Sequence, residues 1–419
     1  MNNPNQPREF DAVLGGQAPP PTDGVVLGGI EGVKQRLKSS NVEIQIAALT
    51  EAMNYGETGL DVVIDTLERL QEQIQYFVAR LLRDKGGQKG KQALLDYNPQ
   101  LFFKKLENWT IEDYNPKVGI IDPVNTAYRL KLDWNRWRNS QATLPNLFES
   151  FLKDSQASQV EALLLPFGSN SSCKLLVNAL VENNDCLTNL KALYIGDMHD
   201  YEYKTSDVTL SNMSPILEAY PHLEILQVRG FGYEGYDDSL KFNPMRHEHL
   251  KTLIVETGYV LSHQVIQQIC TLELPSLEYL ELWLGNDVYY PFWQDEEEPI
   301  SIDESAISNL APIISGEVFP HLKYLGLRSS NCSDVIAESI VKSPLMNSLR
   351  VLDLSMGTLK NKGANVLLNC SAINNLHTLN VSRNLLSTSM IQQLSQLKCR
   401  VIAEPQTNDA EWRYHAITE

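Results

Sequence analysis

Hydrophobic positions recur through the second half of the chain in the pattern Leu-x-x-Leu-x-(Leu/Ile/Val). Seven copies fill all three apolar positions, and they begin at Leu190, Leu223, Leu250, Leu277, Leu322, Leu349 and Leu376. A weaker copy begins at Val160, and the copies follow at similar intervals except for one longer interval between Leu277 and Leu322. The last two apolar positions of each copy lie two apart in sequence and therefore share one face of a short strand. Each copy predicts one strand.

Amphipathic helical patterns separate these strands, at 208–219, 264–270, 304–315, 334–342, 364–370 and 388–396. A strand–helix unit cannot bury its apolar side alone, so neighbouring units stack into a parallel sheet backed by helices. The usual interval between copies lies at the long end of leucine-rich repeats. The sequence therefore predicts an α/β fold, a leucine-rich-repeat horseshoe over 160–403 with strands inside and helices outside. The one longer interval places an insertion at about 286–303.

Three phrases are more specific than the repeat itself. They are LWLGND at 282–287, FPHLKYLGLR at 319–328 and VLDLSMGT at 351–358. With these phrases, residues from about 116 to 400 resemble the ribonuclease-inhibitor-like leucine-rich-repeat proteins of an uncharacterised bacterial family. The resemblance implies the horseshoe fold and no known catalytic activity.

The first hundred residues have a different texture. Residues 1–29 are rich in Gly and Pro and predict a flexible lead. Helical patterns follow at 42–54, 59–70 and 71–84, and the phrase EIQIAA at 43–48 is echoed by QIQYFV at 73–78, which indicates repeated helical hairpins. The phrases AVLGGQ at 12–17, VLGGIEGVKQRL at 26–37, AALTEAMNYGETGLDVVI at 47–64 and NPQLFF at 98–103 are more specific. With them, residues from about 13 to 103 resemble a HEAT-like leader domain attached to many cyanobacterial proteins. That domain is similar to the HEAT-type repeats of phycobilisome lyase relatives. The resemblance implies an all-α accessory domain over 30–103, and no bilin-handling residue of such lyases can be placed in it.

The two ends of the array need covers, because an open sheet edge invites aggregation. Residues 128–134 alternate like a strand and 144–153 read as an amphipathic helix, so we expect 104–159 to form a linker and the N-terminal cap. Residues 400–403 are expected to form a last edge strand, followed by a polar tail at 404–419.

Charge and composition narrow the class of partner. The chain of 419 residues holds 35 basic and 52 acidic side chains, a net charge of −17, which argues against nucleic acid or an anionic membrane as the main partner. It contains no apolar run of about 18 residues and no secretory layout at its start. Its six cysteines are scattered, which is typical of free thiols in a reducing compartment. We expect a cytoplasmic protein.

Motifs for catalysis are not found in the sequence. It holds no phosphate-binding loop, no nucleophile elbow and no HExxH zinc motif. His222, His249 and His321 each precede the first leucine of a repeat, so a structural role is expected for them rather than metal binding. The acidic run at 295–298 is expected to be solvated surface. We predict no enzyme, no cofactor and no metal.

The variable positions between the strand leucines point to the concave surface of the predicted horseshoe. Tyr, Trp and Arg dominate interface hot spots because they bury large area at modest entropic cost. We therefore predict a partner-binding surface at Tyr194, Gln227, Arg229, Glu256, Tyr279, Glu281, Trp283, Tyr324, Arg328 and Asp353. The alternative is that these aromatics pack on one another and on the insertion, which carries Tyr289, Tyr290, Phe292 and Trp293.

The predicted function is a non-catalytic protein–protein interaction module that binds a protein partner on its concave face. A second hypothesis is an inhibitor, in which the acidic horseshoe masks a basic enzyme. A third is an enzymatic or chromophore-handling factor that acts through the helical leader.

Overall fold

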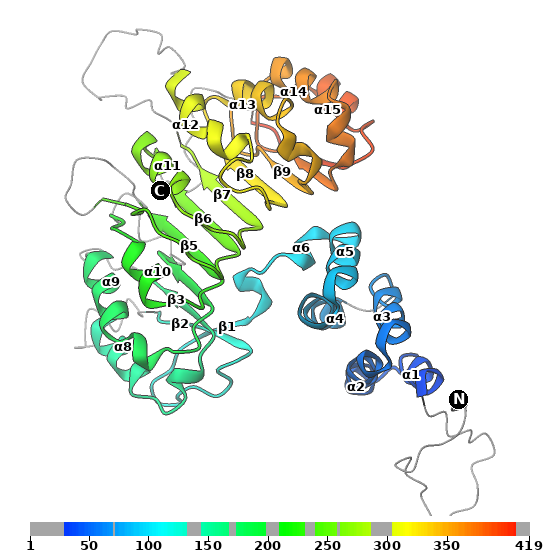
Figure 1. Ribbon diagram of the computed structural model, residues 1–419, viewed down its shortest axis with the longest axis vertical. Helices are drawn as coiled ribbons and strands as arrows, with labels where there is room; N and C mark the ends of the chain where they lie inside the picture. Colours follow the sequence, from blue (N-terminus) through cyan, green and yellow to red (C-terminus); the bar gives the residue numbers. More distant parts are fainter. Residues whose placement is uncertain are drawn as a thin grey trace, which may run out of the picture. The chain divides into compact units, whose positions relative to one another are not determined.

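A computed structural model describes residues 29–69, 72–131, 144–166, 173–197, 209–230, 239–257, 260–285 and 304–407. They belong to two compact units, a helical unit that ends at Phe102 and a repeat unit that begins at Phe103 (Figure 1). The insertion at 286–303 and nearly all of the predicted lead and polar tail lie outside the described residues.

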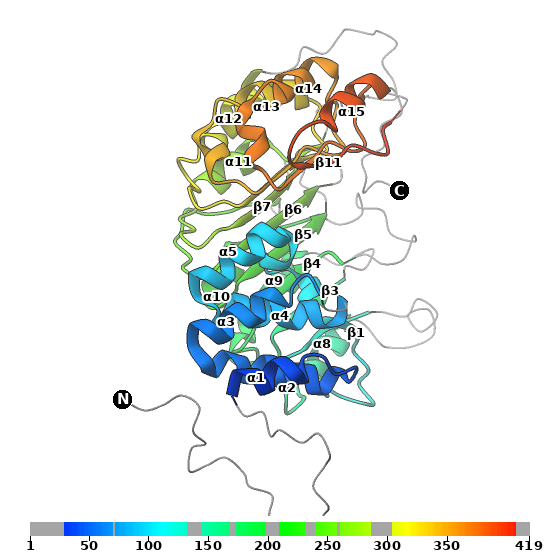
Figure 2. The same cartoon turned by 90° about the vertical axis from the view of Figure 1, so that its right-hand side faces the viewer.

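The helical unit consists of short helices that follow one another closely (Figure 2). They are α1 (Gly29–Arg36), α2 (Val42–Ala52), η1 (Met53–Tyr55), α3 (Gly56–Asp65), α4 (Glu72–Lys85), α5 (Gly87–Tyr97) and α6 (Pro99–Phe102).

The sequence echo between 43–48 and 73–78 corresponds to a repeated contact in this unit. Gln45 Nε2 donates to the carbonyl oxygen of Leu37 at 3.1 Å, and Gln75 Nε2 donates to that of Leu67 at the same distance. Both glutamines therefore tie a helix to the end of the preceding one in the same way. The all-α character of this segment follows the sequence, whereas its membership of the HEAT-like leaders stays a prediction.

The repeat unit is built on a parallel sheet, which has eleven strands in the described residues and runs in chain order from β1 to β11 (Figure 1). The strands are β1 (Thr110–Asp113), β2 (Thr126–Arg129), β3 (Ala162–Leu165), β4 (Ala192–Ile195), β5 (Ile225–Gly230), β6 (Thr252–Thr257), β7 (Tyr279–Trp283), β8 (Tyr324–Arg328), β9 (Val351–Asp353), β10 (Thr378–Asn380) and β11 (Arg400–Ile402). The α/β prediction is confirmed, and this topology is consistent with a leucine-rich-repeat horseshoe.

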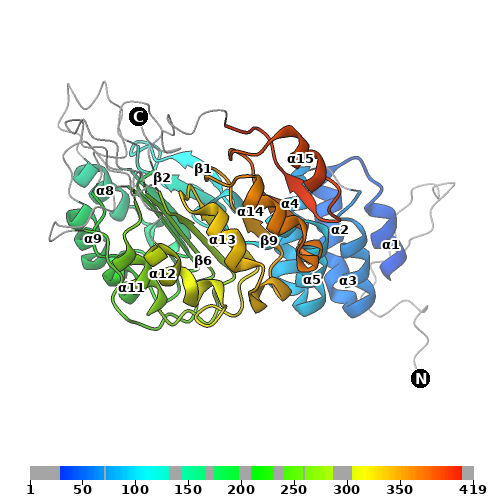
Figure 3. The same ribbon diagram turned by 90° about the horizontal axis from the view of Figure 1, so that it is seen from above.

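Helices cover one face of this sheet (Figure 3). They are α8 (Leu144–Leu152), α9 (Cys173–Glu182), α10 (Ser214–Ala219), α11 (His263–Cys270), α12 (Glu304–Ile314), α13 (Ser333–Ile340), α14 (Asn361–Leu368) and α15 (Thr388–Leu394), with short 3-10 helices at η3 (Ala157–Gln159), η4 (Asn184–Cys186), η6 (Pro344–Asn347) and η7 (Ser371–Asn375). A further 3-10 turn, η2 (Leu106–Asn108), packs against the opposite face. The repeat leucines Leu193, Leu226, Leu253, Leu280 and Leu325 are fully buried on this side. Each contributes roughly 1.5–3 kcal/mol by leaving water, so the repeat pattern forms the core.

The start of the sheet and helix α10 differ most from the sequence prediction, while the strand expected at 128–134 is β2 and the helix expected at 59–70 is α3, each with shifted bounds. The sheet begins at Thr110, well before the first repeat at 160, because β1 and β2 add two parallel strands in register, Thr110 opposite Thr126. The leucine pattern misses β1, where exposed Glu112 occupies the position that a leucine fills elsewhere. Helix α10 starts at Ser214 rather than at 208, because Pro215 fits only the first turn of a helix.

Candidate functional site

The sheet face opposite the helices α8–α15 is the concave face of the predicted horseshoe, and strand register arranges its side chains in three rows. The first row contains Ile225, Thr252, Tyr279, Tyr324 and Val351; the middle row Tyr194, Gln227, Ile254, Glu281, Gly326 and Asp353; and the last row Arg229, Glu256, Trp283 and Arg328. All ten predicted binding residues lie on these rows. Their role in binding a partner stays a proposal.

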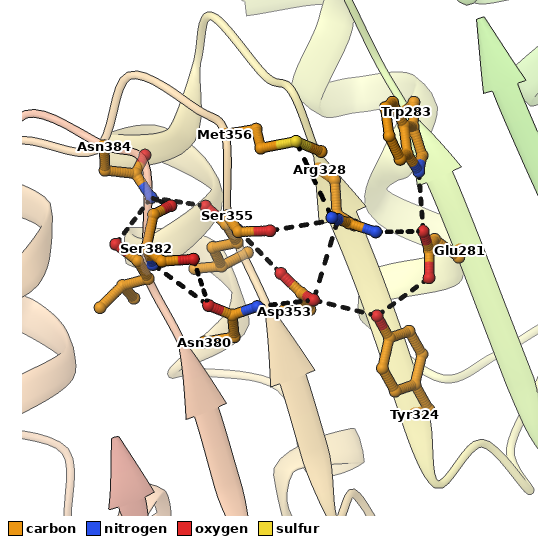
Figure 4. A network of polar contacts seen from close by, with 12 residues as sticks. Glu281, Trp283, Tyr324, Arg328, Asp353, Ser355, Met356, Asn380, Ser382 and Asn384 are labelled. Atoms are coloured by element: carbon orange, nitrogen blue, oxygen red, sulfur yellow. Dashed lines mark hydrogen bonds and ion pairs between the residues drawn. The ribbon is translucent and has the colours of Figure 1, made fainter. Parts of the chain in front are cut away.

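Glu281 is the centre of a buried polar cluster on β7 and β8. Its carboxylate accepts hydrogen bonds from Trp283 Nε1 at 2.7 Å and Arg328 Nη1 at 2.5 Å (Figure 4). It also accepts one from Tyr279 Oη at 2.6 Å. Residues 279, 281 and 283 alternate along one strand, so their side chains share one face. Burial opposes ionisation of Glu281, but the Arg328 guanidinium and these donors outweigh it and lower its pKa to about 2.

The cluster continues toward β9 and β10. The Tyr324 hydroxyl lies 3.0 Å from Glu281 and 3.1 Å from Asp353, and Asn380 Nδ2 donates to Asp353 at 3.0 Å (Figure 4). Gly326 lies between the two carboxylates in the middle row, and a Cβ there would meet the Tyr324 ring at 2.9 Å. The glycine therefore leaves the space in which the tyrosine reaches both acids.

The two central tyrosines are covered by the chain itself. Tyr279 and Tyr324 stack with ring centroids 3.8 Å apart and an interplanar angle of 9°. Phe103 places its ring edge-on against both, at 5.2 and 5.8 Å. All three side chains are buried. We call residues Phe103–Trp109, which begin with this phenylalanine, the strap.

The strap crosses the first row toward β1. Thr252 Oγ1 donates to the carbonyl oxygen of Lys104 at 2.7 Å, and Lys104 Nζ forms an ion pair with Glu224 at 2.5 Å. Leu106 packs with Ala192 and Ile225, among other apolar side chains of β2 to β5. The chain then enters β1 at Thr110. The strap thus makes an apolar, a polar and an ionic contact on the sheet, as a bound peptide would.

Lys105 of the strap adds a cation to the central cluster. Its Nζ lies 4.6 Å from the centroid of the Tyr279 ring, a favourable cation–π distance. Burial lowers the pKa of Lys105, and the charges of Glu281 and Asp353 oppose that effect. Together with Arg328, Lys105 balances the two carboxylates.

A second charged group lies on β5 and β6. Arg229 donates from Nε and Nη2 to Glu256 Oε2, each at 2.6 Å, and Gln227 Nε2 donates to Glu256 Oε1 at 2.5 Å. Burial and the charge of Glu281 raise the pKa of Glu256 in spite of this arginine. The Arg229 guanidinium also lies 5.7 Å from the centroid of the Tyr194 ring.

The Tyr194 hydroxyl is a buried donor with no hydrogen-bond partner among the described residues. Arg129 and Asp197, which lie nearby, are already joined by an ion pair of 2.5 Å.

The sequence leaves open whether the concave aromatics bind a partner or are covered internally. The structure covers Tyr279 and Tyr324 with the strap, whereas the insertion lies outside the described residues. Sequence reasoning missed Phe103, Lys104 and Lys105, which it assigned to a domain end and a linker. Two basic residues between the apolar Phe103 and Leu106 are the only available signal, and this order has no repeat period.

His222 and His249, at two of the repeat boundaries, make structural contacts, and so does the nearby His247. His247 Nε2 lies 3.1 Å from the Tyr220 carbonyl oxygen, and its Nδ1 accepts from the backbone N–H of Leu250. The rings of His222 and His249 meet edge to face, with centroids 5.3 Å apart and an interplanar angle of 60°. Within the described ranges, no group of three His, Cys, Asp or Glu side chains is placed to hold a metal ion. No helix in this part of the chain is long and apolar enough to span a membrane.

Comparisons with known proteins bear on the fold. No family model matches the chain, and neither does any curated protein. A crystal structure of a Bacteroides fragilis protein, solved as a structural genomics target, matches with a TM-score of 0.55 at 24% identity, over 65% of this chain and 72% of that chain. An internalin from Listeria monocytogenes matches with a TM-score of 0.32 at 15% identity, over 67% of this chain and 62% of that chain. The first likeness supports the fold alone, and the second is too distant to carry an argument.

Proposed function

We propose that this protein is a non-catalytic interaction module that binds a protein partner on the concave face of its repeat unit. The surface would be the middle and last rows, since the strap already occupies the first. The carrying observation is that the last row holds Arg229, Trp283 and Arg328 in fixed positions through buried carboxylates. Side chains fixed before binding lose little conformational entropy when a partner arrives.

The arrangement of groups favours binding over catalysis. Catalytic acid–base pairs need accessible groups whose environments separate their pKa values. Glu281 is instead saturated by three donors besides the Tyr324 hydroxyl, and Glu256 by three donor groups. A saturated carboxylate can position a neighbouring cation but cannot easily take a proton from a substrate.

A bulky substitution on the concave face tests this proposal. Ser382 follows β10 on the last row and is half-buried, so Ser382→Trp would place an indole over that face. Ser395, at the end of α15, is exposed on the helical side and gives the matched control Ser395→Trp. Proteins captured from native cytosol by the unmodified chain should be lost with Ser382→Trp and kept with Ser395→Trp.

Both variants are first checked for intact folding by circular dichroism. If both baits capture the same proteins in the same amounts, the concave face is not the binding surface. Loss with Ser395→Trp alone would instead assign binding to the helical side.

A further inference from the structure

The arginines of the last row are partly exposed, whereas the carboxylates that hold them are buried. The Arg229 and Arg328 side chains are 27% and 22% exposed, whereas Glu256 and Glu281, which hold them, are 4% and 6% exposed. The net charge of −17 describes the whole chain, but this strip offers guanidinium groups to an approaching partner.

Each of these guanidinium groups is fixed from behind. Arg229 donates from Nε and Nη2 to Glu256. Arg328 bonds Glu281 through Nη1 and Ser355 through Nε, which also lies 3.8 Å from Asp353, and its Nη2 lies 3.8 Å from Met356 Sδ (Figure 4). Its guanidinium carbon lies 4.7 Å from the centroid of the Trp283 ring, and the second N–H of each Nη completes the fork. An arginine held in this way keeps a planar fork with further N–H donors, the geometry that recognises carboxylates.

Resting on the proposed function, we infer that the concave partner presents an acidic extended segment, whose carboxylates pair with Arg229 and Arg328. These arginines lie three strands apart in one register row, Arg229 opposite Glu256, then Trp283, then Arg328. Three strand steps are about 14 Å, and four residues of an extended segment span about 13 Å. The segment therefore carries two acidic residues at positions i and i+4, on the same face, and passes over Trp283.

A nucleic acid would also offer anions, but the net charge of −17 repels a continuous phosphate backbone. A short acidic segment carries far less charge and meets only the local field. Arg129 on β2 resembles the two arginines, yet its Nη1 already lies 3.3 Å from the exposed carboxylate of Asp113, so it is not included.

The experiment uses the full chain and a phage-displayed library of random dodecapeptides. Peptides enriched on the chain and excluded by Ser382→Trp are sequenced, synthesised and titrated. The expected result is a motif with Asp or Glu at i and i+4. The association constant of the peptide should fall at least about tenfold with Arg229→Gln, the loss expected when a charge-assisted hydrogen bond is removed.

Removing an arginine from a buried carboxylate can unfold a protein, so a charge-neutral variant accompanies it. Arg229→Gln/Glu256→Gln removes both charges together, and the tenfold loss should persist. The matched control is Lys191→Gln/Glu161→Gln, which removes a similar ion pair of 2.5 Å at the strand entry and should leave peptide binding unchanged.

The outcomes separate this inference from the proposed function. Basic or apolar peptides that Ser382→Trp excludes would overturn the acidic partner while leaving the concave surface in place, and basic ones would favour the inhibitor hypothesis. An acidic motif that binds the charge-neutral variant equally well would also overturn the role of these arginines. No peptide that depends on the concave face would overturn both proposals.

Discussion

Phe103 offers a direct test of whether the strap stabilises the repeat unit. Its side chain is 1% exposed and lies edge-on against Tyr279 and Tyr324. A phenylalanine buries roughly 150–200 Å², and at about 25 cal/mol per Å² the part lost on truncation to alanine is worth about 3 kcal/mol. The empty space left behind adds to that cost. Phe103→Ala should therefore lower the free energy of unfolding of the repeat unit by about 3 kcal/mol or more.

Tryptophan fluorescence in a urea titration measures this free energy selectively. All six tryptophans of the chain follow residue 102, so the signal reports the repeat unit and not the helical unit. The matched control is Leu175→Ala on α9, because Leu175 is 68% exposed and its truncation should cost about 0.5 kcal/mol or less.

A loss below about 1 kcal/mol for Phe103→Ala would refute the reasoning, because a well-packed phenylalanine cannot be removed so cheaply. The strap would then be detached from the sheet in solution. The first row, with Tyr279 and Tyr324, would become available to a partner.

Three further predictions concern single groups. Glu281→Gln should lower the free energy of unfolding of the repeat unit by about 3 kcal/mol at pH 7, because a pKa of about 2 in the folded state against 4.5 in the unfolded state stabilises the ionised form. The difference in unfolding free energy between the variant and the unmodified chain should shrink as pH falls from 4.5 toward 2. A difference that does not change with pH in urea titrations would contradict this prediction. Tyr194→Phe should raise the unfolding free energy by about 1 kcal/mol, since it removes a buried hydroxyl without a partner among the described residues, and a loss in the same titration would show that the hydroxyl is bonded. Gly59→Ala should lower the free energy of unfolding of the helical unit by about 2 kcal/mol, because the new Cβ would lie 1.8 Å from the Ala52 carbonyl oxygen. Amide hydrogen exchange in α2 and α3 should become faster, and unchanged exchange would exclude the clash.

The sequence predicts the repeat unit well because its signal is local and periodic. Leucines at fixed spacing define the buried side of each strand, and the residues between them fall on the opposite face by simple alternation. The residues of the three rows can therefore be predicted by counting positions from the repeat leucines. The alignment of Arg229, Glu256, Trp283 and Arg328 needs only equal register in every repeat, which the parallel strands provide.

Contacts between distant and non-repeating positions are what the sequence does not reveal. Phe103 meets Tyr279 and Tyr324 from a remote part of the chain, and no period relates them. Glu281 appears in the sequence as one of many acids, and its role as a hub depends on donors from two strands. The leucine pattern does not reveal strand β1, because Glu112 stands where a leucine is expected. This strand is recognised only from its pairing with β2 in the structure.

The strap also has a mechanical consequence. Between Phe103 and Thr110 the chain makes seven steps, which reach about 24 Å when fully extended. Along the sheet, β1 and β8 are separated by seven strand spacings, about 34 Å. The strap thus takes a direct path between two distant parts of the curved sheet. Aromatic contacts of Phe103 with β7 and β8 anchor one end, and strand β1 anchors the other. Solenoids flex by changing curvature, and flattening this one would move β7 and β8 away from β1 and so lengthen the path that the strap and its aromatic contacts have to span. The strap thus opposes straightening of the part of the array between β1 and β8.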